Sequence, residues 1–92
     1  MKINTQFHGI LADWVGTRSA SFELSDGATY ADLMKEIRRR YHRSMPDQLW
    51  DRDKNRFHSK VHAFRQGKAL NAMDLQLLDG EELIFYLLMA GG

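Results

Sequence analysis

Two stretches near the start of the sequence alternate between apolar and polar residues. Residues 2–8 place one set of side chains on a common face, namely Ile3, Thr5 and Phe7. Residues 18–24 repeat the pattern with the apolar residues Ala20, Phe22 and Leu24. Because a period of two is typical of a half-buried strand, we expect two strands that pair as a hairpin. Residues 9–17 between them are expected to form a turn whose apolar side chains cover the end of the sheet.

The period changes to that of a helix after Gly27. Apolar side chains then recur at helical spacing, at Tyr30, Leu33, Met34, Ile37 and Tyr41. This spacing predicts one amphipathic helix, the only long helix in the sequence. Thr29 is expected to cap its start together with Asp32. Glu36 and Arg40 are expected to form an i,i+4 ion pair.

The second half of the sequence begins with a polar loop over residues 44–56. Pro46 favours one short helical turn in this loop, and Leu49 and Trp50 are expected to hold it against the body of the protein. Residues 57–66 predict a third strand that closes at Gly67-Lys68. Residues 70–78 are consistent with either a short edge strand or a 3₁₀ turn.

The last element follows the turn dipeptide Asp79-Gly80 and is an unbroken apolar run over residues 83–90. Eight residues are too few to cross a membrane, which takes about eighteen, but they suit a buried strand. We expect this strand to pair in parallel with the first one. The predicted architecture is a single α+β domain over residues 1–92. It is a β-grasp, ubiquitin-like fold in which a mixed sheet of four to five strands packs on one main helix.

One helix can cover only one face of this sheet, yet the final strand is apolar on both faces. We therefore expect an exposed docking patch for a partner on the second face, made of Ile84, Tyr86, Leu88 and Phe64. The alternative is that the loop over residues 44–56 folds across this face and covers it.

Composition narrows the possible functions. The sequence contains no cysteine, which excludes disulfides, thiolate metal sites and cysteine nucleophiles. A formal net charge of +1 gives no reason to expect a nucleic-acid partner. The alternating pattern begins at Lys2 with no apolar segment before it, so we expect no secretory signal, no membrane association and a cytoplasmic location.

The sequence finishes on Gly91-Gly92 directly after the apolar run. Glycines can pass through a channel that is too narrow for other residues and let a main-chain carboxylate approach another backbone closely. We expect Met89, Ala90 and Gly91 to thread into a partner and to present Gly92. The alternative is a frayed terminus with no role.

Three segments together carry a resemblance to a known family. They are the strand Val61-His62-Ala63-Phe64-Arg65-Gln66-Gly67, the turn Leu78-Asp79-Gly80-Glu81-Glu82 and the ending Ala90-Gly91-Gly92. With one hairpin and one helix before them, they resemble the ThiS/MoaD family of small ubiquitin-like sulfur carriers. The resemblance covers the whole chain in pattern, and its most specific part is residues 77–92.

The resemblance implies a function at the terminal carboxylate. An adenylating enzyme of the ubiquitin-activating type would use ATP to convert the Gly92 carboxylate to an acyl-adenylate. A sulfur donor would then replace the adenylate, giving a thiocarboxylate for a sulfur-accepting synthase of molybdopterin-type or thiamin-type biosynthesis. The chain would be a co-substrate and not an enzyme, with no catalytic side chain and no bound cofactor. The pathway stays open among molybdopterin, thiamin, an amino acid and a thiolated tRNA.

Other chemistries have weaker support. His58 and His62 would lie too far apart on a strand to share a metal ion, so we expect no metal site. Asp51-Arg52-Asp53-Lys54-Asn55 begins like a calcium loop but has Arg56 where glycine is required, so we expect a turn. No hydrolase nucleophile motif is present.

The competing function is a ubiquitin-like binding or modifier module that acts through its exposed sheet face.

Overall fold

The structure is a computed structural model that describes residues 1–70 and 72–87. In this part of the chain the elements follow in the order β1 (Lys2–Phe7), α1 (Ile10–Val15), β2 (Ser19–Glu23), α2 (Tyr30–Tyr41), β3 (Trp50–Asp51), β4 (Arg56–Phe57), β5 (Val61–Arg65), β6 (Lys68–Ala69) and β7 (Glu82–Leu87).

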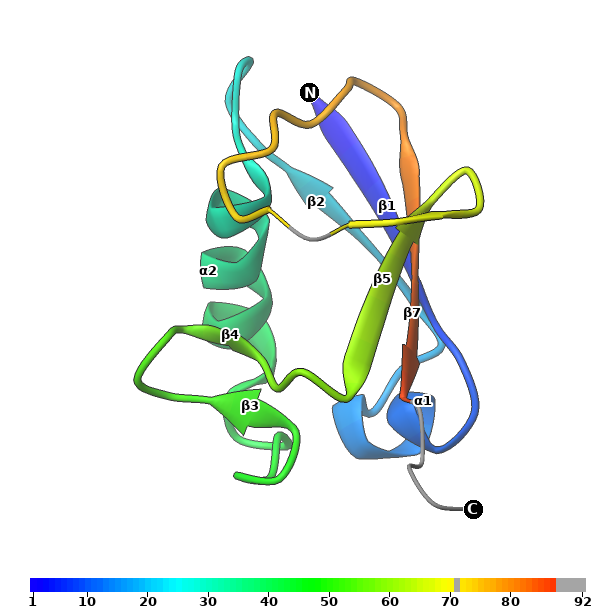
Figure 1. Cartoon of the computed structure of the whole chain (residues 1–92), viewed down its shortest axis with the longest axis vertical. Helices are drawn as coiled ribbons and strands as arrows, with labels where there is room; N and C mark the ends of the chain where they lie inside the picture. The colour runs from blue at the N-terminus through cyan, green and yellow to red at the C-terminus, as the bar shows by residue number, and fades with distance from the viewer. Residues whose placement is uncertain (71, 88–92) are drawn as a thin grey trace.

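Five strands form one mixed sheet in the order β2-β1-β7-β5-β6, and α2 lies along one face of it (Figure 1). The first two strands pair antiparallel, with Ile3 opposite Phe22. β7 occupies the centre, parallel to β1 and antiparallel to β5. The predicted hairpin, the parallel pairing of the last strand with the first and the β-grasp fold class are all confirmed.

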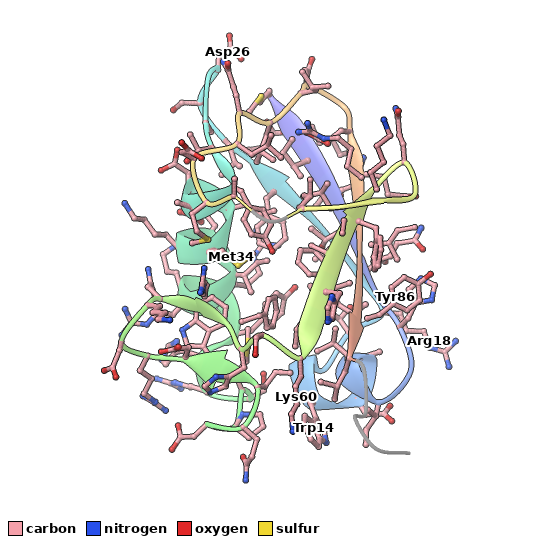
Figure 2. The ribbon with its side chains drawn as sticks, in the orientation of Figure 1. Trp14, Arg18, Asp26, Met34, Lys60 and Tyr86 are labelled. Carbon is pink, nitrogen blue, oxygen red and sulfur yellow. The ribbon has the colours of Figure 1, made fainter. Side chains whose placement is uncertain are left out.

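The core lies between the sheet and α2. The alternating residues predicted for one face of β1 are buried, and Phe7 stacks on Phe85 of β7 with ring centroids 5.4 Å apart. From the helix, the predicted apolar face contributes Leu33, Met34 and Ile37, all fully buried. Met34 points from α2 toward the sheet in Figure 2. The period-two and helical patterns of the sequence therefore meet in one core.

The segment after β1 is a short helix, α1, and not the predicted turn. It is six residues long and lies between Gly9 and Gly16, which adopt φ values of 61° and 96°. Such positive φ angles are strained for residues with a Cβ atom, so glycine suits both ends. Leu11 and Val15, four positions apart, are buried. The predicted role of covering the sheet is met, since α1 lies at the end of the sheet where β7 stops (Figure 1).

The predicted third strand is also wrong in its extent, because residues 57–66 belong to two different sheets. Phe57 ends β4, which pairs with β3 in a separate two-stranded sheet that the sequence did not predict. Only β5 belongs to the main sheet. Gln66 and Gly67 form the two-residue turn from β5 to β6. Their φ values of 49° and 79° are both positive, as a type I′ hairpin turn requires.

Residues 70–78 were expected to form either a short edge strand or a 3₁₀ turn, and the described part of this segment, residues 70 and 72–78, forms neither. The short edge strand, β6, comes earlier, at Lys68–Ala69. Beyond it, Gln76 makes an isolated bridge to Thr29 beside the start of α2. Residue 71 lies outside the described part of the chain.

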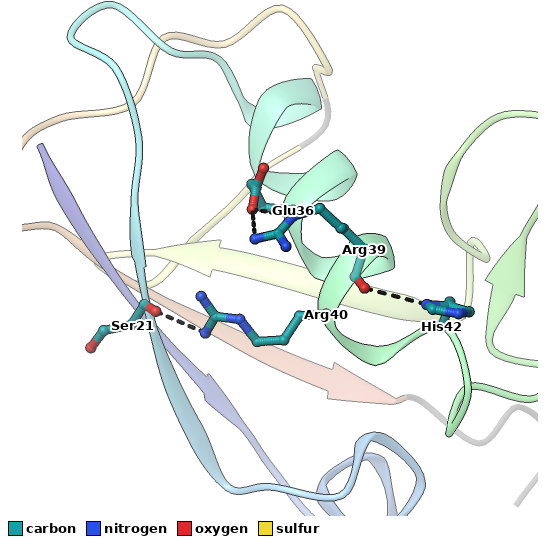
Figure 3. A network of polar contacts seen from close by, with 5 residues as sticks. All are labelled: Ser21, Glu36, Arg39, Arg40 and His42. Carbon is teal, nitrogen blue, oxygen red and sulfur yellow. Dashed lines mark hydrogen bonds and ion pairs between the residues drawn. The ribbon is translucent and has the colours of Figure 1, made fainter.

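The start of α2 is capped as predicted. The Thr29 hydroxyl accepts from the backbone N–H of Asp32, and the Asp32 carboxylate accepts from the backbone N–H of Thr29. The expected Glu36–Arg40 pair is wrong, however. Glu36 pairs with Arg39 at 2.8 Å, while Arg40 turns toward β2 (Figure 3).

Candidate docking surface

Side chains of β7 alternate between the two faces of the sheet. Leu83 and Phe85 are fully buried against α2. Ile84 is half-buried and Tyr86 is 37% exposed on the opposite face. The Tyr86 side chain projects away from α2 in Figure 2. The sequence prediction that the final strand is apolar on both faces therefore holds for the described residues.

The structure brings three of the four residues predicted for docking into contact. Phe64 of β5 lies directly opposite Ile84 of β7 in the strand register. The ring of Phe64 meets the ring of Tyr86 edge-on, with centroids 5.6 Å apart. We call Phe64, Ile84 and Tyr86 the outer patch. Leu88, the fourth predicted member, lies outside the described residues.

Polar side chains border the outer patch, and the sequence reasoning did not include them in it. The ring centroids of His8 and Tyr86 are 4.7 Å apart, and His62 lies opposite Tyr86 in the register of β5 and β7. Gln6 donates a 2.8 Å hydrogen bond to Glu82 and lies 3.3 Å from the His8 ring nitrogen. The alternation that put Phe7 in the core already placed Gln6 and His8 on the outer face. An apolar centre with a polar rim is the usual composition of a protein interface.

The loop over residues 44–56 does not cover the outer patch. Leu49 and Trp50 are buried in the core on the helix side of the sheet, as their predicted anchoring role requires. At the end of the two-stranded sheet, the Phe57 ring lies 5.4 Å from the ring of buried Phe85. The alternative that this loop folds across the second face is therefore wrong.

The calcium-like segment forms a turn, as predicted. It connects β3 to β4, and the Asp51 carboxylate accepts hydrogen bonds from the backbone N–H groups of Asp53 and Lys54. These bonds hold the pKa of Asp51 below its usual value, with the Lys54 N–H making the largest contribution. Within residues 1–70 and 72–87, no group of three or more histidine, aspartate and glutamate side chains is arranged to hold a metal ion.

The arginines at the end of α2 point in different directions, as expected for consecutive helix positions. Arg39 binds Glu36, and Arg40 reaches the Ser21 carbonyl on β2 (Figure 3). Arg38 lies 3.4 Å from the Asn55 side chain. Among the described residues, neither helix is long and apolar enough to cross a lipid bilayer.

The residues predicted to thread and react lie beyond the end of β7. Met89, Ala90, Gly91 and Gly92 are outside the described residues, so their roles stay predictions. The described chain does show what precedes them. Leu87 ends the central strand of the sheet, and the remaining five residues follow it directly in the sequence.

Comparison with known proteins rests on structure. No family model and no curated protein matches the sequence. SAMP1 of Haloferax volcanii superposes with a TM-score of 0.80 at 20% identity, covering all of both chains. A putative molybdopterin converting factor subunit 1 of Pyrococcus furiosus gives 0.72 at 20% identity, over 97% of this chain and 99% of that one.

A third solved structure contains two proteins in complex. It is the BexX/CysO complex of Amycolatopsis orientalis, which gives a TM-score of 0.65 at 17% identity and covers 98% of this chain and 99% of the other. This chain has their β-grasp fold. The fold that the sequence resemblance implied is therefore confirmed, and at these identities the likeness is one of fold.

Proposed function

We propose that this chain is a sulfur carrier that works through the carboxylate of Gly92. The observation that carries the proposal is the position of β7. It is the central strand of a β-grasp sheet, and the sequence Leu88-Met89-Ala90-Gly91-Gly92 follows it directly. A rigid central strand fixes the point from which a short glycine tail departs. It therefore reduces the conformational entropy that is lost when a partner binds the tail.

The proposed chemistry takes place at the terminus and in two steps. The Gly92 carboxylate attacks the α-phosphorus of ATP on an adenylating enzyme, which releases pyrophosphate and leaves an acyl-adenylate. A sulfur donor then attacks the acyl carbon, AMP departs and a thiocarboxylate remains. Adenylation is needed because a plain carboxylate is a poor acceptor for a nucleophile. ATP would be bound and used by the activating enzyme and not by this chain. Because the chain has no cysteine, the transferred sulfur would be carried at the Gly92 terminus and not on a side chain.

The outer patch would dock the protein partners. Its aromatic and branched side chains supply buried contact area, which offsets the cost of ordering the tail. The partners we propose are an adenylating enzyme of the ubiquitin-activating type, a sulfur donor and a sulfur-accepting synthase in the cytoplasm. The CysO protein occurs in a complex with BexX, which supports a partner protein for this chain too.

A second candidate function is a ubiquitin-like modifier or binding module. The outer patch favours it, because a module of this kind needs only an exposed surface and not a reactive sulfur. A structural neighbour described as small archaeal modifier protein 1 supports this candidate. In that case Gly92 would be joined to a lysine of a target or would have no role.

The experiment that tests the first proposal is intact mass spectrometry after incubation with ATP, a candidate adenylating enzyme and a sulfur donor. We expect one terminal oxygen to be replaced by sulfur. A chain extended beyond Gly92 is the control and should remain unchanged in mass while keeping its fold. If several competent activating enzymes leave the native-length chain unchanged, the carrier proposal is wrong and the modifier proposal gains support.

A further inference from the structure

A second apolar surface lies on α1, beside the end of β7. This short helix buries Leu11 and Val15, which are four positions apart and belong to the core. Ile10 and Trp14 are also four positions apart, so they share another face of the helix. Ile10 is 43% exposed, and Trp14 is half-buried where it packs against the core. We call Ile10 and Trp14 the α1 ridge.

The α1 ridge is held next to the last residues of β7. The backbone N–H of His8 donates a 3.1 Å hydrogen bond to the Phe85 carbonyl, and α1 itself contacts β7. Figure 2 shows Trp14 at the base of the molecule, near the point where β7 ends. The His8 ring, 4.7 Å from the Tyr86 ring, connects this region to the outer patch. The two apolar surfaces therefore meet around the end of the central strand.

The loop before β3 gives this region a preformed shape. The Ser44 hydroxyl donates a 2.9 Å hydrogen bond to the Val15 carbonyl, which ties the loop to the end of α1. Trp14 lines a hollow of about 530 Å³ together with Asp13, Ser44, Pro46 and Gln48. Asp13 is exposed, and no cation pairs with it within the described residues. A partner that fits here offers apolar contact to the ridge and a cation to Asp13.

The length of the tail determines which partner meets this surface. Five residues separate Leu87 from the end of the sequence. A fully extended chain advances at most about 3.6 Å per residue, so an enzyme that reacts at Gly92 holds its reactive centre within about 18 Å of the end of β7. An enzyme that encloses the glycines in a narrow channel has the mouth of that channel closer still. The residues around the end of β7 are therefore the ones that such an enzyme covers.

We propose that the α1 ridge is a second docking site for the adenylating enzyme that activates Gly92. Ile10 and Trp14 pack against an apolar rim at the mouth of its channel, and Asp13 pairs with a basic side chain of that rim. Tryptophan suits an anchoring role because its ring buries a large area in an interface. Contacts from both the α1 ridge and the outer patch restrict the direction of the tail more than contact with the outer patch alone. The inference rests on the proposed function, since an enzyme that reacts at Gly92 has to approach this end of the sheet.

The test is direct binding of the full chain to an adenylating enzyme of the ubiquitin-activating type, measured by calorimetry without ATP or a sulfur donor. Ile10→Ser and Trp14→Leu should each raise Kd about tenfold, because each removes apolar contact area at the centre of the interface. Leu78→Ser is the matched control. Leu78 is also a large exposed apolar residue, at 57%, but it precedes the start of β7 and lies away from its end. The Kd of this control should equal that of the unmodified chain.

Urea unfolding of each variant accompanies the binding measurement, because Trp14 packs partly against the core. Ile10→Ser changes an exposed side chain and carries the test by itself if Trp14→Leu does not fold. The inference is overturned if the folded ridge variants bind as tightly as the unmodified chain, if Leu78→Ser weakens binding as much as they do, or if the unmodified chain does not bind.

Intact mass with ATP and a sulfur donor added separates this inference from the carrier proposal. Weakened binding of the ridge variants together with no sulfur on the unmodified chain refutes sulfur transfer and supports the docking site. Sulfur transfer at the same Kd for all variants supports the carrier proposal and refutes the docking site.

Discussion

The guanidinium carbon of Arg40 lies 4.1 Å from the centroid of the Phe22 ring, and Arg40 Nη1 donates a 2.9 Å hydrogen bond to the Ser21 carbonyl. β2 is an edge strand of the main sheet, so this carbonyl has no strand neighbour on that side. Arg40 thus joins the end of α2 to the open edge of the sheet (Figure 3). It also shields the Phe22 ring of the core. Shielding an edge in this way also opposes pairing with another chain.

We expect Arg40→Ala to lower the free energy of unfolding by about 1 kcal/mol. It removes a cation–π contact and a hydrogen bond from a charged donor, each of which contributes a net amount of that order or less. Urea unfolding followed by tryptophan fluorescence measures the change. Arg39→Ala is the matched control, since it removes an ion pair with Glu36 that is exposed to solvent and therefore contributes little to stability. Equal losses for the two variants would contradict the assigned role of Arg40.

The same contact shows why one sequence prediction was wrong. Glu36 and Arg40 have the spacing of a helical ion pair, and spacing alone predicts that they bind each other. The structure pairs Glu36 with Arg39, because Arg40 is occupied by Phe22 and Ser21 on another element. Contacts between distant segments cannot be read from local spacing.

Elements with a long repeating pattern were predicted well, and short ones were not. β1, β2 and α2 each show several repeats of their period, and β7 belongs to an unbroken apolar run of strand length. α1 has only six residues, although Leu11, Trp14 and Val15 already had helical spacing. β3 and β4 have two residues each, too few to show any period. The structure of these short segments is determined by which of their side chains the rest of the protein buries, and not by a local sequence pattern.

The outer patch could be predicted because β7 is apolar at consecutive positions. A strand whose sheet is covered on only one face needs apolar residues only at alternate positions, so the additional apolar residues indicate a second contact surface. The alternation of β1 is enough to place Gln6 and His8 on the outer face of the sheet. It does not show that the His8 ring contacts the Tyr86 ring. That contact depends on the register between β1 and β7, which the sequence does not specify.

Asp32 provides a prediction about pH. The backbone N–H of Thr29 binds the Asp32 carboxylate and holds its pKa below the usual 3.8. A lowered pKa in the folded state stabilises the protein above the unfolded pKa, and this stabilisation is lost as the pH falls through the folded value. We expect Asp32→Ala to cost about 1 kcal/mol at pH 7, the usual value of a cap.

The cost of Asp32→Ala should decrease when the pH falls below about 3.8, the ordinary value for an aspartate. Urea unfolding at a series of pH values from 7 downward measures this. Asp74→Ala, at an exposed position, is the control for general acid effects. A cost for Asp32→Ala that is the same at every pH would show that the carboxylate charge does not contribute to the cap.

Tyr86 tests the docking role of the outer patch. Tyr86→Ala removes the ring that contacts Phe64 and His8, and we expect kcat/KM for thiocarboxylate formation to fall by at least about tenfold. Because Tyr86 is partly exposed, the stability of the protein should change little. The measurement is the initial rate of the mass change with a competent activating enzyme.

Leu78→Ala is the matched control for Tyr86→Ala. Leu78 is also a large exposed apolar residue, at 57%, but it lies outside the outer patch. Its rate should equal that of the unmodified chain. If Tyr86→Ala reacts as fast as Leu78→Ala, the activating enzyme does not dock on the outer patch, although the Gly92 chemistry could still stand.

Arg65 and Glu81 form a bidentate ion pair with distances of 2.6 and 2.9 Å. The side chains are only 22% and 9% exposed, and Glu81 also accepts from the backbone N–H of Leu78. The pair therefore fastens the turn before β7 to the neighbouring strand β5. Arg65→Met should lower the free energy of unfolding by about 2 kcal/mol, since it leaves a largely buried carboxylate without its cation.

The double variant Arg65→Met/Glu81→Leu shows whether that loss comes from the unpaired charge. Replacing both partners by apolar side chains removes the stranded carboxylate, so the double variant should be more stable than Arg65→Met alone. Glu82→Leu, at an exposed position one residue later, controls for the loss of an acidic residue and should cost less. Urea unfolding of the unmodified chain, Arg65→Met, Glu81→Leu and the double variant gives the coupling energy between the two side chains. Additive losses would mean that the pair acts as two independent surface charges, and that the turn before β7 is held by its backbone alone.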